Sequence, residues 1–446
     1  MKKILSMLIV VITISAQSQQ KKWTLTECVQ YALENNISVK QSELDIESAD
    51  IERLTAIGSF IPSLNANAAV SENTGLSFDP VTNNARTTTF LSASGGIGAN
   101  YTLFDGLRNV RALQRAKISK LASQYRLDKM KDDISLFVAN AYLQVILNKA
   151  NLEVLQSQND VTKAQIKRTN DLVDAGSLPK GDLLEIKAVD ASEQQAIINA
   201  ENSIQISLIS LAQSLLIKDY ENFDVIDEGY DVVDDGIIKK SVSEILTQSK
   251  ESRSEIKIAE QDVELATKDV QIAKSANIPR LSASFNYNTR YSDAPSFGQQ
   301  VADPFIEQLY TNDGIGYGLN LNIPIFNGFS TKASVKRSKL NLERSKFRLE
   351  QAELDLESNV YQAYLDAKGA LKSYEAAKLA LGSQELAYDY AKERYDVGLT
   401  NAFDFSQSKL RFDNAKIEVN RAKYDYIFKL KVLELYFGIP PTELKF

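Results

Sequence analysis

The chain has 446 residues but only 9 prolines and 19 glycines, so its secondary-structure elements must be unusually long. It has no histidine and one cysteine, which excludes Ser-His-Asp triads, Cys-His nucleophile pairs, histidine zinc sites and intrachain disulfides. The net charge of −7 argues against a nucleic-acid partner, which would require a basic face. We therefore expect neither catalysis nor a bound cofactor or metal ion.

The first residues are typical of a secretory signal peptide. Two lysines precede an apolar run over residues 4–14, and the small residues Ala16 and Ser18 provide a site for a signal peptidase. This run is too short to cross a bilayer, for which a helix needs about 20 residues, so a transmembrane anchor is the weaker interpretation. We expect residues 1–18 to be removed, with cleavage after Ser18.

The rest of the chain contains an internal repeat. Three pairs of segments match at offsets of 217 or 222 residues: 60–64 with 277–281, 103–106 with 325–328, and 174–176 with 396–398. Each half predicts helix, strand, long loop, strand, very long helix, turn and helix. In the first half we expect these elements at 24–59, 63–71, 94–104, 107–175 and 183–217. In the second half we expect them at 241–276, 280–290, 314–325, 329–397 and 405–437.

These matches divide the chain into four segments. After the signal peptide (1–18) we expect a first structural repeat over 19–217, an acidic linker over 218–240 and a second structural repeat over 241–446. Eight acids oppose Lys218 within residues 218–236, which predicts a solvated surface connection. An enzyme that uses paired carboxylates such as Asp234 and Asp235 is disfavoured, because no apolar surroundings are present to shift their pKa.

The long helices predict extended packing of helix against helix. No proline or glycine lies between Gly106 and Gly176, so a helix of about 69 residues, about 100 Å long, is uninterrupted. Apolar residues recur in steps of four and three over 134–155, and the same register returns over 356–381. On the helices alone, a tube and an extended coiled-coil scaffold are equally good interpretations.

Four short segments carry an alternating pattern with aliphatic and aromatic residues on one face and Gly, Asn and Ser on the other. The alternation is complete in 281–290 and 315–323 and weaker in 63–70 and 96–103. It is typical of transmembrane barrel strands, although a single strand of a soluble sandwich would show the same period. The long segments that join the strands of each pair, about 72–93 and 291–313, are polar and predict loops.

Four strands cannot close a barrel, and open strand edges cannot face lipid because their amides and carbonyls would lack partners. Copies of the chain must then pool their strands under cyclic symmetry. Two chains would give about 8 strands, a barrel filled by its own side chains, whereas three chains would give about 12 and leave room for water. The fold class we expect is mainly α, with a long-helix α-barrel and a membrane β-barrel part to which each chain contributes four strands.

The order of parts resembles the TolC-like outer-membrane efflux proteins, also called outer membrane factors, from Trp23 to Gly438. Short motifs carry the resemblance: Leu-Thr-Glu-Cys at 25–28, Pro-x-Leu at 62–64 and 279–281, Phe-x-Gly at 104–106 and 326–328, and Arg-Tyr-Asp-Val-Gly-Leu-Thr at 394–400. The resemblance implies a homotrimer with a 12-stranded barrel in the lipid bilayer of the cell outer membrane and a helical tunnel in the periplasm. It also implies two partners, a periplasmic adaptor (membrane fusion) protein and an inner-membrane transporter.

The resemblance assigns roles to the two hairpin ends. It implies adaptor contact at seven residues: Gly176, Ser177, Leu178, Val397, Gly398, Leu399 and Thr400. It implies a channel constriction at Asp182 and Asp404, where Gln407 replaces a second acid of the best-known pattern. Two plainer roles stay open, because each glycine is also a helix C-cap signal and each aspartate a candidate helix cap.

We therefore interpret the chain as a passive exit duct of a tripartite efflux or type I secretion system. A pump in the inner membrane would drive it through the adaptor, and because that partner sets the cargo, export of drugs, metal ions or proteins stays open. The alternative is a periplasmic or surface coiled-coil scaffold, an interaction protein without a pore.

Overall fold

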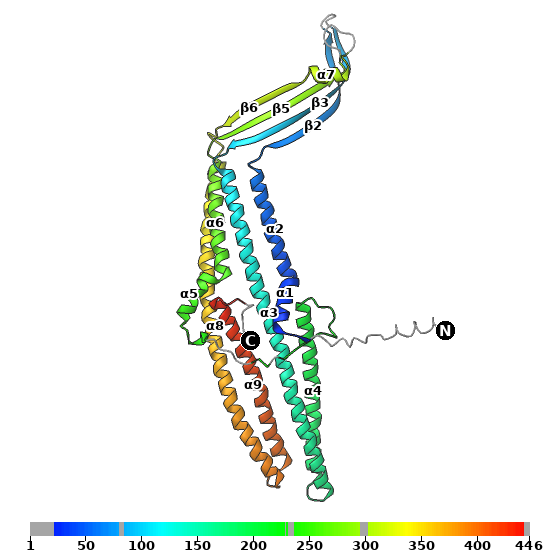
Figure 1. The fold of residues 1–446 in the computed structure, drawn as a ribbon, viewed down its shortest axis with the longest axis vertical. Helices are drawn as coiled ribbons and strands as arrows, with labels where there is room; N and C mark the ends of the chain where they lie inside the picture. The colour runs from blue at the N-terminus through cyan, green and yellow to red at the C-terminus, as the bar shows by residue number, and fades with distance from the viewer. Residues whose placement is uncertain (1–21, 80–83, 228, 231–235, 295–301, 441–446) are drawn as a thin grey trace, which may run out of the picture. The chain divides into compact units, whose positions relative to one another are not determined.

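Figure 1 shows the protein as a computed structural model that describes residues 22–79, 84–227, 229–230, 236–294 and 302–440. The chain forms two compact units. The helical unit contains the described residues of Met1–Glu43, Tyr125–Ile256 and Gln351–Phe446, and the sheet unit contains those of Leu44–Gln124 and Lys257–Glu350. The expected signal peptide and the linker residues 228 and 231–235, which include Asp234 and Asp235, lie outside the described residues.

The helices recur with matching lengths along the chain. In the first half, α1 (Leu25–Asn35) and α2 (Ile37–Gly58) have the same lengths as α5 (Val242–Ser252) and α6 (Ser254–Ser275) in the second. α3 (Arg108–Asp174) and α8 (Ser330–Asp396) both have 67 residues, and α4 (Lys180–Ser214) corresponds to α9 (Ala402–Phe437). The order of elements recurs as the sequence predicts, while the boundaries of the two repeats stay a prediction. None of the helices in the described residues is long and apolar enough to span a membrane.

In each half of the chain, the first predicted helix is divided into two helices by one residue with an extended backbone. The predicted single helices over 24–59 and 241–276 are wrong at this point, because Asn36 (ψ 133°) ends α1 and Arg253 (ψ 130°) ends α5. Asn36 Oδ1 accepts a hydrogen bond of 2.8 Å from the backbone N–H two residues later, at the start of α2. A short polar side chain that bonds its own backbone in this way competes with a continuous helix.

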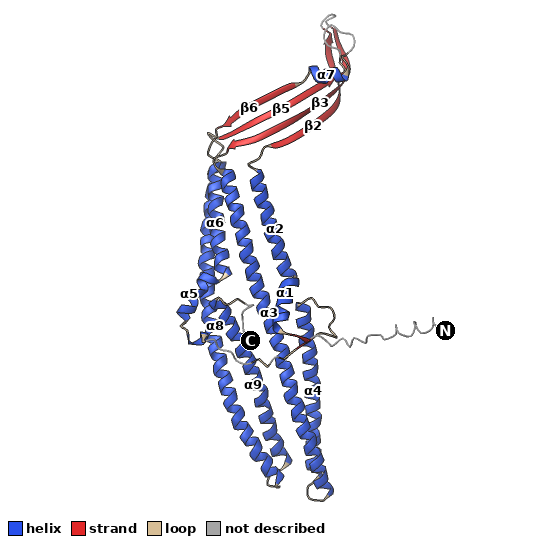
Figure 2. Cartoon of the chain, in the orientation of Figure 1, coloured by secondary structure: helices blue, strands red, loops and turns tan. Residues whose placement is uncertain are grey.

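Four of the strands form one sheet in the order β2, β3, β5, β6, drawn in red in Figure 2. Their bounds are Ser63–Asp79 for β2, Asn84–Phe104 for β3, Arg280–Ser292 for β5 and Gly314–Asn322 for β6. Neighbouring strands are antiparallel throughout. Within the described residues, β2 and β6 pair along one side only, so the sheet is open at both edges.

The register of the sheet places like side chains in rows across all four strands. One row is apolar: Leu64, Ala99, Phe285 and Tyr317. The adjacent row, on the opposite face, is small and polar: Asn65, Gly98, Asn286 and Gly316. The apolar row is uncovered, with Leu64 71% and Tyr317 86% exposed. The alternation predicted for the separate strands is confirmed and continues across the sheet.

The strands of the first half are longer than predicted. β2 and β3 extend through most of the polar segment 72–93, which the sequence predicts as a loop. The hydroxyls of Thr74 and Thr89 lie 2.8 Å apart across this extension. Cross-strand threonine pairs and the β-propensity of threonine favour a hairpin even where apolar alternation is missing. The second predicted loop, 291–313, contains the short helix α7 (Phe305–Thr311).

The acidic linker is more than the expected surface connection. Its β4 strand (Asp224–Val225) pairs in parallel with β1 (Lys22–Trp23) in the helical unit. Lys149 of α3 donates a hydrogen bond of 2.5 Å to the Asp224 carboxylate, and the neighbouring Val225 is buried. Apolar residues between the acids of the linker were the signal for this packing, which the net charge of the segment masks.

Candidate functional site

Both long hairpins turn through the same backbone motif. The N–H of Ser177 donates to the carbonyl of the fifth residue before it at 2.8 Å, and the N–H of Leu399 does the same at 2.8 Å. Gly176 and Gly398 both have φ +75°, the left-handed region that strains residues with a Cβ. These are Schellman ends, so the interpretation of both glycines as helix C-caps is confirmed.

The seven residues expected to contact an adaptor all lie in these two turns. Their side chains are exposed except for those of Leu178 and Thr400, which are half-buried. Val397 and Leu399 are 69% and 70% exposed, so the second turn presents two apolar side chains to its surroundings. Such side chains suit a protein partner, and adaptor contact stays a prediction.

The two constriction aspartates lie one turn inside the returning helices. Pro179 is the N-cap residue of α4, and Asn401 is the N-cap residue of α9, so both helices begin three residues earlier than predicted. Asn401 Oδ1 accepts a hydrogen bond of 2.8 Å from the N–H of Asp404. The capping role considered for Asp404 therefore belongs to Asn401, and the charge of Asp404 stabilises the positive end of the helix dipole.

Asp404 and Gln407 present a polar face near the start of α9. Both side chains are exposed, whereas Asp182 is half-buried. The hydroxyl of Thr400 donates a hydrogen bond of 3.3 Å to the Asp404 carboxylate, which holds this side chain beside the turn. One chain supplies each residue once, so a ring around a channel would need symmetric copies.

Two links join α3 to α8 shortly before the turns. The hydroxyls of Thr169 and Tyr395 lie 3.1 Å apart, and Arg168 forms an ion pair with the Asp396 carboxylate and donates to the Asp396 carbonyl at 3.1 Å. Tyr395 is buried, and its ring stacks on that of Phe405 in α9 with centroids 5.0 Å apart. Partners on different helices leave no spacing signal in the sequence, so neither link could be predicted.

A buried lysine fastens α9 to α3 and α4. Lys409 donates to the Gln158 carbonyl at 2.8 Å, the Thr162 hydroxyl at 2.7 Å and the Glu193 carboxylate at 2.6 Å. The Asp413 carboxylate lies 3.7 Å from the same ammonium group. An ammonium group has three donors, and all of them are used here, as a buried charge requires.

Burial raises the pKa of Asp413 to about 6, from an ordinary value near 3.8. The Lys409 ammonium opposes this rise, and the Glu193 carboxylate adds to it. The carboxyl group therefore changes its charge near pH 6 instead of near pH 4. In the part of the chain that the structure describes, no group of three acidic or cysteine side chains is placed to hold a metal ion.

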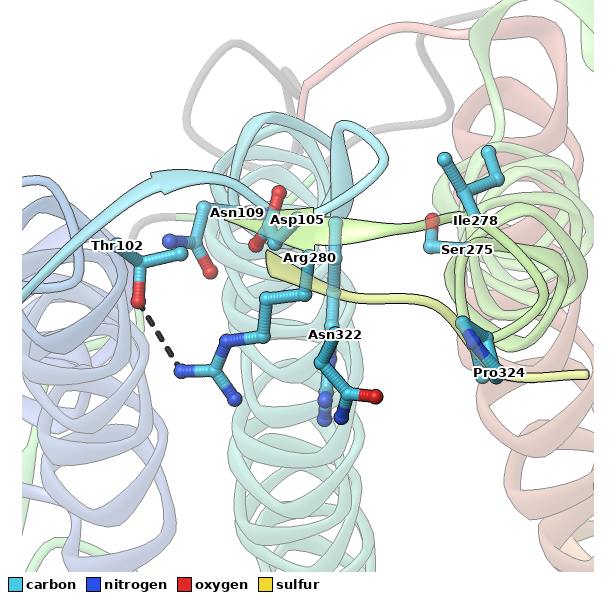
Figure 3. Close-up of a pocket in the computed structure, with 10 residues that line it drawn as sticks. Thr102, Asp105, Asn109, Ser275, Ile278, Arg280, Asn322 and Pro324 are labelled. Carbon is cyan, nitrogen blue, oxygen red and sulfur yellow. Dashed lines mark hydrogen bonds between the residues drawn. The ribbon is translucent and has the colours of Figure 1, made fainter. Parts of the chain in front are cut away.

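A polar pocket of about 240 Å³ lies in the sheet unit, where the strands give way to helices (Figure 3). Arg280 of β5 donates a hydrogen bond of 3.1 Å to the Thr102 hydroxyl of β3. Asp105 accepts a hydrogen bond of 3.0 Å from a backbone N–H in the first turn of α3. Gly106 has φ +70°, and a Cβ there would lie 2.7 Å from Ile278. The Phe-Asp-Gly motif is therefore explained by helix capping and close packing.

Comparison with known proteins gives a family match over most of the chain. A family model described as outer membrane efflux protein matches residues 28–215 and 245–438. The outer membrane protein TolC of Vibrio cholerae serotype O1 is 23% identical over 326 residues, which is 72% of this chain and 70% of that protein.

Solved structures of outer-membrane channels share the fold. The channel CmeC of Campylobacter jejuni has a TM-score of 0.78 at 19% identity, with 93% of this chain and 85% of that chain covered. The protein VceC of Vibrio cholerae has a TM-score of 0.76 at 18% identity, with 93% of this chain and 96% of that chain covered. The expected fold class, mainly α with long helices and a β part, is confirmed.

Proposed function

The chain belongs to the outer membrane efflux protein family, a family of channels rather than enzymes, and we propose that it is the outer-membrane exit duct of a tripartite efflux or type I secretion system. In this role it is a passive conduit that joins the periplasm to the exterior. An inner-membrane transporter supplies the driving force through a periplasmic adaptor.

The open sheet with one uncovered apolar face is the observation that carries this proposal. Its apolar row suits lipid, and its opposite row of Asn and Gly suits water. The free edges of β2 and β6 would have no hydrogen-bond partners in lipid unless neighbouring copies supply them. Three copies would close a barrel of about 12 strands, wide enough to hold water.

The helices supply the tunnel in this proposal. α3 and α8, with 67 residues each, are about 100 Å long, far deeper than an ordinary globular core requires. A periplasmic location for this part of the chain is consistent with the expected secretory signal, residues 1–18. The exposed side chains of the turns at Gly176 and Gly398 would meet the adaptor.

The ends of the hairpins also provide a closed state. In a trimer, Asp182, Asp404 and Gln407 would each occur three times around the axis, and the carboxylates would favour cations. The Arg168–Asp396 and Thr169–Tyr395 links hold the α8–α9 hairpin against the α3–α4 hairpin. Release of these links would let the hairpins separate and widen the passage.

The test is purification of the chain in detergent, followed by measurement of its mass and of its conductance in planar bilayers. The proposal predicts a particle of three chains with a discrete single-channel conductance. The coiled-coil scaffold predicts a protein that stays soluble without detergent and forms no pore. A soluble monomer without conductance would contradict the exit-duct proposal and favour the coiled-coil scaffold.

A further inference from the structure

The short helix α7, Phe305–Thr311, packs beside the last residues of β5 and belongs to the same compact unit as the sheet (Figure 2). The pairing of β5 with β6 ends at Asn288 and Gly314. β5 itself continues to Ser292, so residues 289–292 extend beyond the end of β6. α7 lies along this extension and takes the place of the missing strand.

Hydrogen bonds hold α7 firmly against β5. Gln308 is 7% exposed, and its side chain bonds both backbone groups of Ser292: Nε2 donates to the carbonyl at 2.8 Å, and Oε1 accepts from the N–H at 3.0 Å. The Thr289 hydroxyl donates to the Leu309 carbonyl at 2.7 Å. Backbone groups of a strand that are satisfied in this way can lie beside lipid without a further strand.

α7 lies on the apolar face of the sheet. Phe285 of β5 belongs to the apolar row, and because side chains alternate along a strand, Thr289 and Tyr291 point to the same face. Both residues contact α7. Thr289 does so through its hydrogen bond to Leu309, and Tyr291 does so through a ring contact with Phe305 at 5.0 Å between centroids. The helix therefore covers part of the face that the proposed function places in lipid.

The seven residues of α7 separate into an apolar and a polar side. At about 100° per residue, one arc of the helix contains Phe305, Ile306, Leu309 and Tyr310, and the other contains Glu307, Gln308 and Thr311. Ile306 and Tyr310 lie opposite the buried Gln308 and are 62% and 77% exposed. α7 therefore directs two large apolar side chains away from the strands and into its surroundings.

The position of α7 along β5 matches the outer boundary of a bilayer. Thr289, which bonds α7, lies nine residues after Arg280, the charged first residue of β5. Nine residues of strand rise about 30 Å, and a tilt of about 40° reduces this height to about 23 Å. The apolar band of an outer-membrane barrel is about 25 Å tall. A helix at this height lies where acyl chains meet headgroups, the level at which tyrosine is enriched.

We propose that α7 is an interfacial helix that binds lipid at the outer boundary of the bilayer. Ile306 and Tyr310 enter the ends of the acyl chains near the headgroups, and Glu307 faces water. The apolar arc of α7 continues the apolar face of the sheet, which favours lipid over a neighbouring copy of the chain as its partner. This proposal rests on the proposed function, because that function places the sheet in the membrane.

The test adds tryptophan at single positions and measures quenching by brominated lipid. The natural chain has one tryptophan, Trp23 in the helical unit, which supplies the baseline. Tyr310→Trp, Glu307→Trp and Tyr317→Trp each add a second one at an exposed position. Each full chain is reconstituted in vesicles of phosphatidylcholine that carries bromine either near the headgroup end or near the methyl end of its acyl chains. Fluorescence is compared with that in unbrominated vesicles.

The three variants should report three different environments. Tyr310→Trp should lose about twofold more fluorescence to bromine near the headgroup than to bromine near the methyl end. Glu307→Trp, on the same helix but on its polar side, should lose no more than the natural chain to either lipid and should be quenched by iodide in water. Tyr317→Trp, in the apolar row of β6, should lose more to bromine near the methyl end.

Equal quenching of Tyr310→Trp and Glu307→Trp by brominated lipid would overturn the proposal. So would a Tyr310→Trp chain that is quenched no more than the natural chain. If Tyr317→Trp is quenched as expected in the same experiment, the sheet lies in lipid, and only the role of α7 fails. If Tyr310→Trp is quenched and Tyr317→Trp is not, α7 binds lipid and the membrane barrel of the proposed function fails. If neither is quenched, both proposals fail.

Discussion

The α3–α4 and α8–α9 hairpins have the same backbone conformation at their turns but differ in the burial and contacts of their side chains. Both turn at a glycine with φ +75° and close with the same hydrogen bond. Where α9 has the buried Lys409, the matching position of α4 has the exposed Lys187. Where α9 has the neutral Gln407, α4 has the acidic Glu185.

This difference shows that the internal repeat preserves the backbone structure of the hairpins, while their contacts depend on side chains that differ between the two halves. The α8–α9 hairpin carries both of the partners that fasten it to α3, Tyr395 and Asp396, and also the buried lysine. Of the matching residues in the first hairpin, Asp174 and Lys187 are exposed and Val173 is half-buried. We therefore expect equivalent substitutions in the two hairpins to have unequal effects.

The largest difference is expected for the two lysines. Lys409→Met leaves the buried carboxylate of Asp413 and the half-buried carboxylate of Glu193 without their ammonium partner, which should lower the free energy of unfolding by about 3–5 kcal/mol. Lys187→Met changes an exposed side chain and should stay within about 0.5 kcal/mol. Guanidinium unfolding of the purified chains, followed by circular dichroism, measures both, and similar shifts would contradict the asymmetry.

The second difference is a pH dependence that comes from Asp413 of α9, because the matching position of α4 is Ala191, which does not titrate. The pKa of Asp413 is raised to about 6 in the folded chain, whereas its ordinary value is near 3.8. Between these values the folded chain binds more protons than the unfolded chain, so the free energy of unfolding falls as the pH rises from about 4 to about 6. The loss is at most about 3 kcal/mol, because each pKa unit corresponds to about 1.4 kcal/mol.

Asp413→Asn should remove this part of the pH dependence. The measurement compares unfolding midpoints of the natural and Asp413→Asn chains at several pH values between 4 and 7. Asp132, whose pKa is also raised to about 6 by burial, contributes equally to both chains and cancels in the difference. If the difference between the unfolding midpoints of the two chains stays constant from pH 4 to pH 7, Asp413 is not the source of the pH dependence.

The third difference concerns the links that hold the hairpins together. Tyr395→Phe removes the hydroxyl that meets Thr169, a change worth about 1 kcal/mol, so the open probability of the channel should rise about fivefold. Tyr390→Phe, on the same helix at a 67% exposed position, is the matched control. Single-channel recordings in which both variants behave alike would show that this link does not hold the closed state.

The smallest effect on stability is expected at the constriction aspartates. Asp404→Ala should cost less than about 1 kcal/mol of folding free energy, since Asn401 caps the helix. It should nevertheless raise conductance or reduce cation selectivity in planar bilayers, and Asp182→Ala should do so less because Asp182 is half-buried. An unchanged Asp404→Ala record would leave the carboxylate only its role in the first helical turn.

Features with a regular period could be predicted from the sequence. The alternation of residues 315–323 determines which face of β6 is apolar, and the glycines at 176 and 398 mark the ends of the 67-residue helices. Both signals are local, because a strand has period two and a helix ends where a left-handed residue is easiest to place. Repetition of each signal in the second half made the prediction firmer.

Features that depend on contacts between helices could not be predicted. Thr169 and Tyr395 lie on two different helices, and the sequence around each residue does not indicate that the two side chains are in contact. Lys409 did leave a signal, because it interrupts the apolar stripe that contains Phe405 and Phe412, but its acceptors on α3 and α4 are visible only in the fold. The interruption at Asn36 was likewise missed, because a single polar residue does not disturb the helical period.

The most direct test of the account is cross-linking of the two free edges of the sheet. Each chain carries two introduced cysteines, one at Asn65 or Asn67 of β2 and one at Asn320 or Asn322 of β6. All four positions lie on the face of the sheet that should meet water. Cys28 is fully buried and does not compete. In outer membranes treated with an oxidant, the account predicts disulfide-linked species of two and three chains and none larger. A chain that never cross-links at these edges, or a ladder that continues beyond three, would contradict the shared barrel.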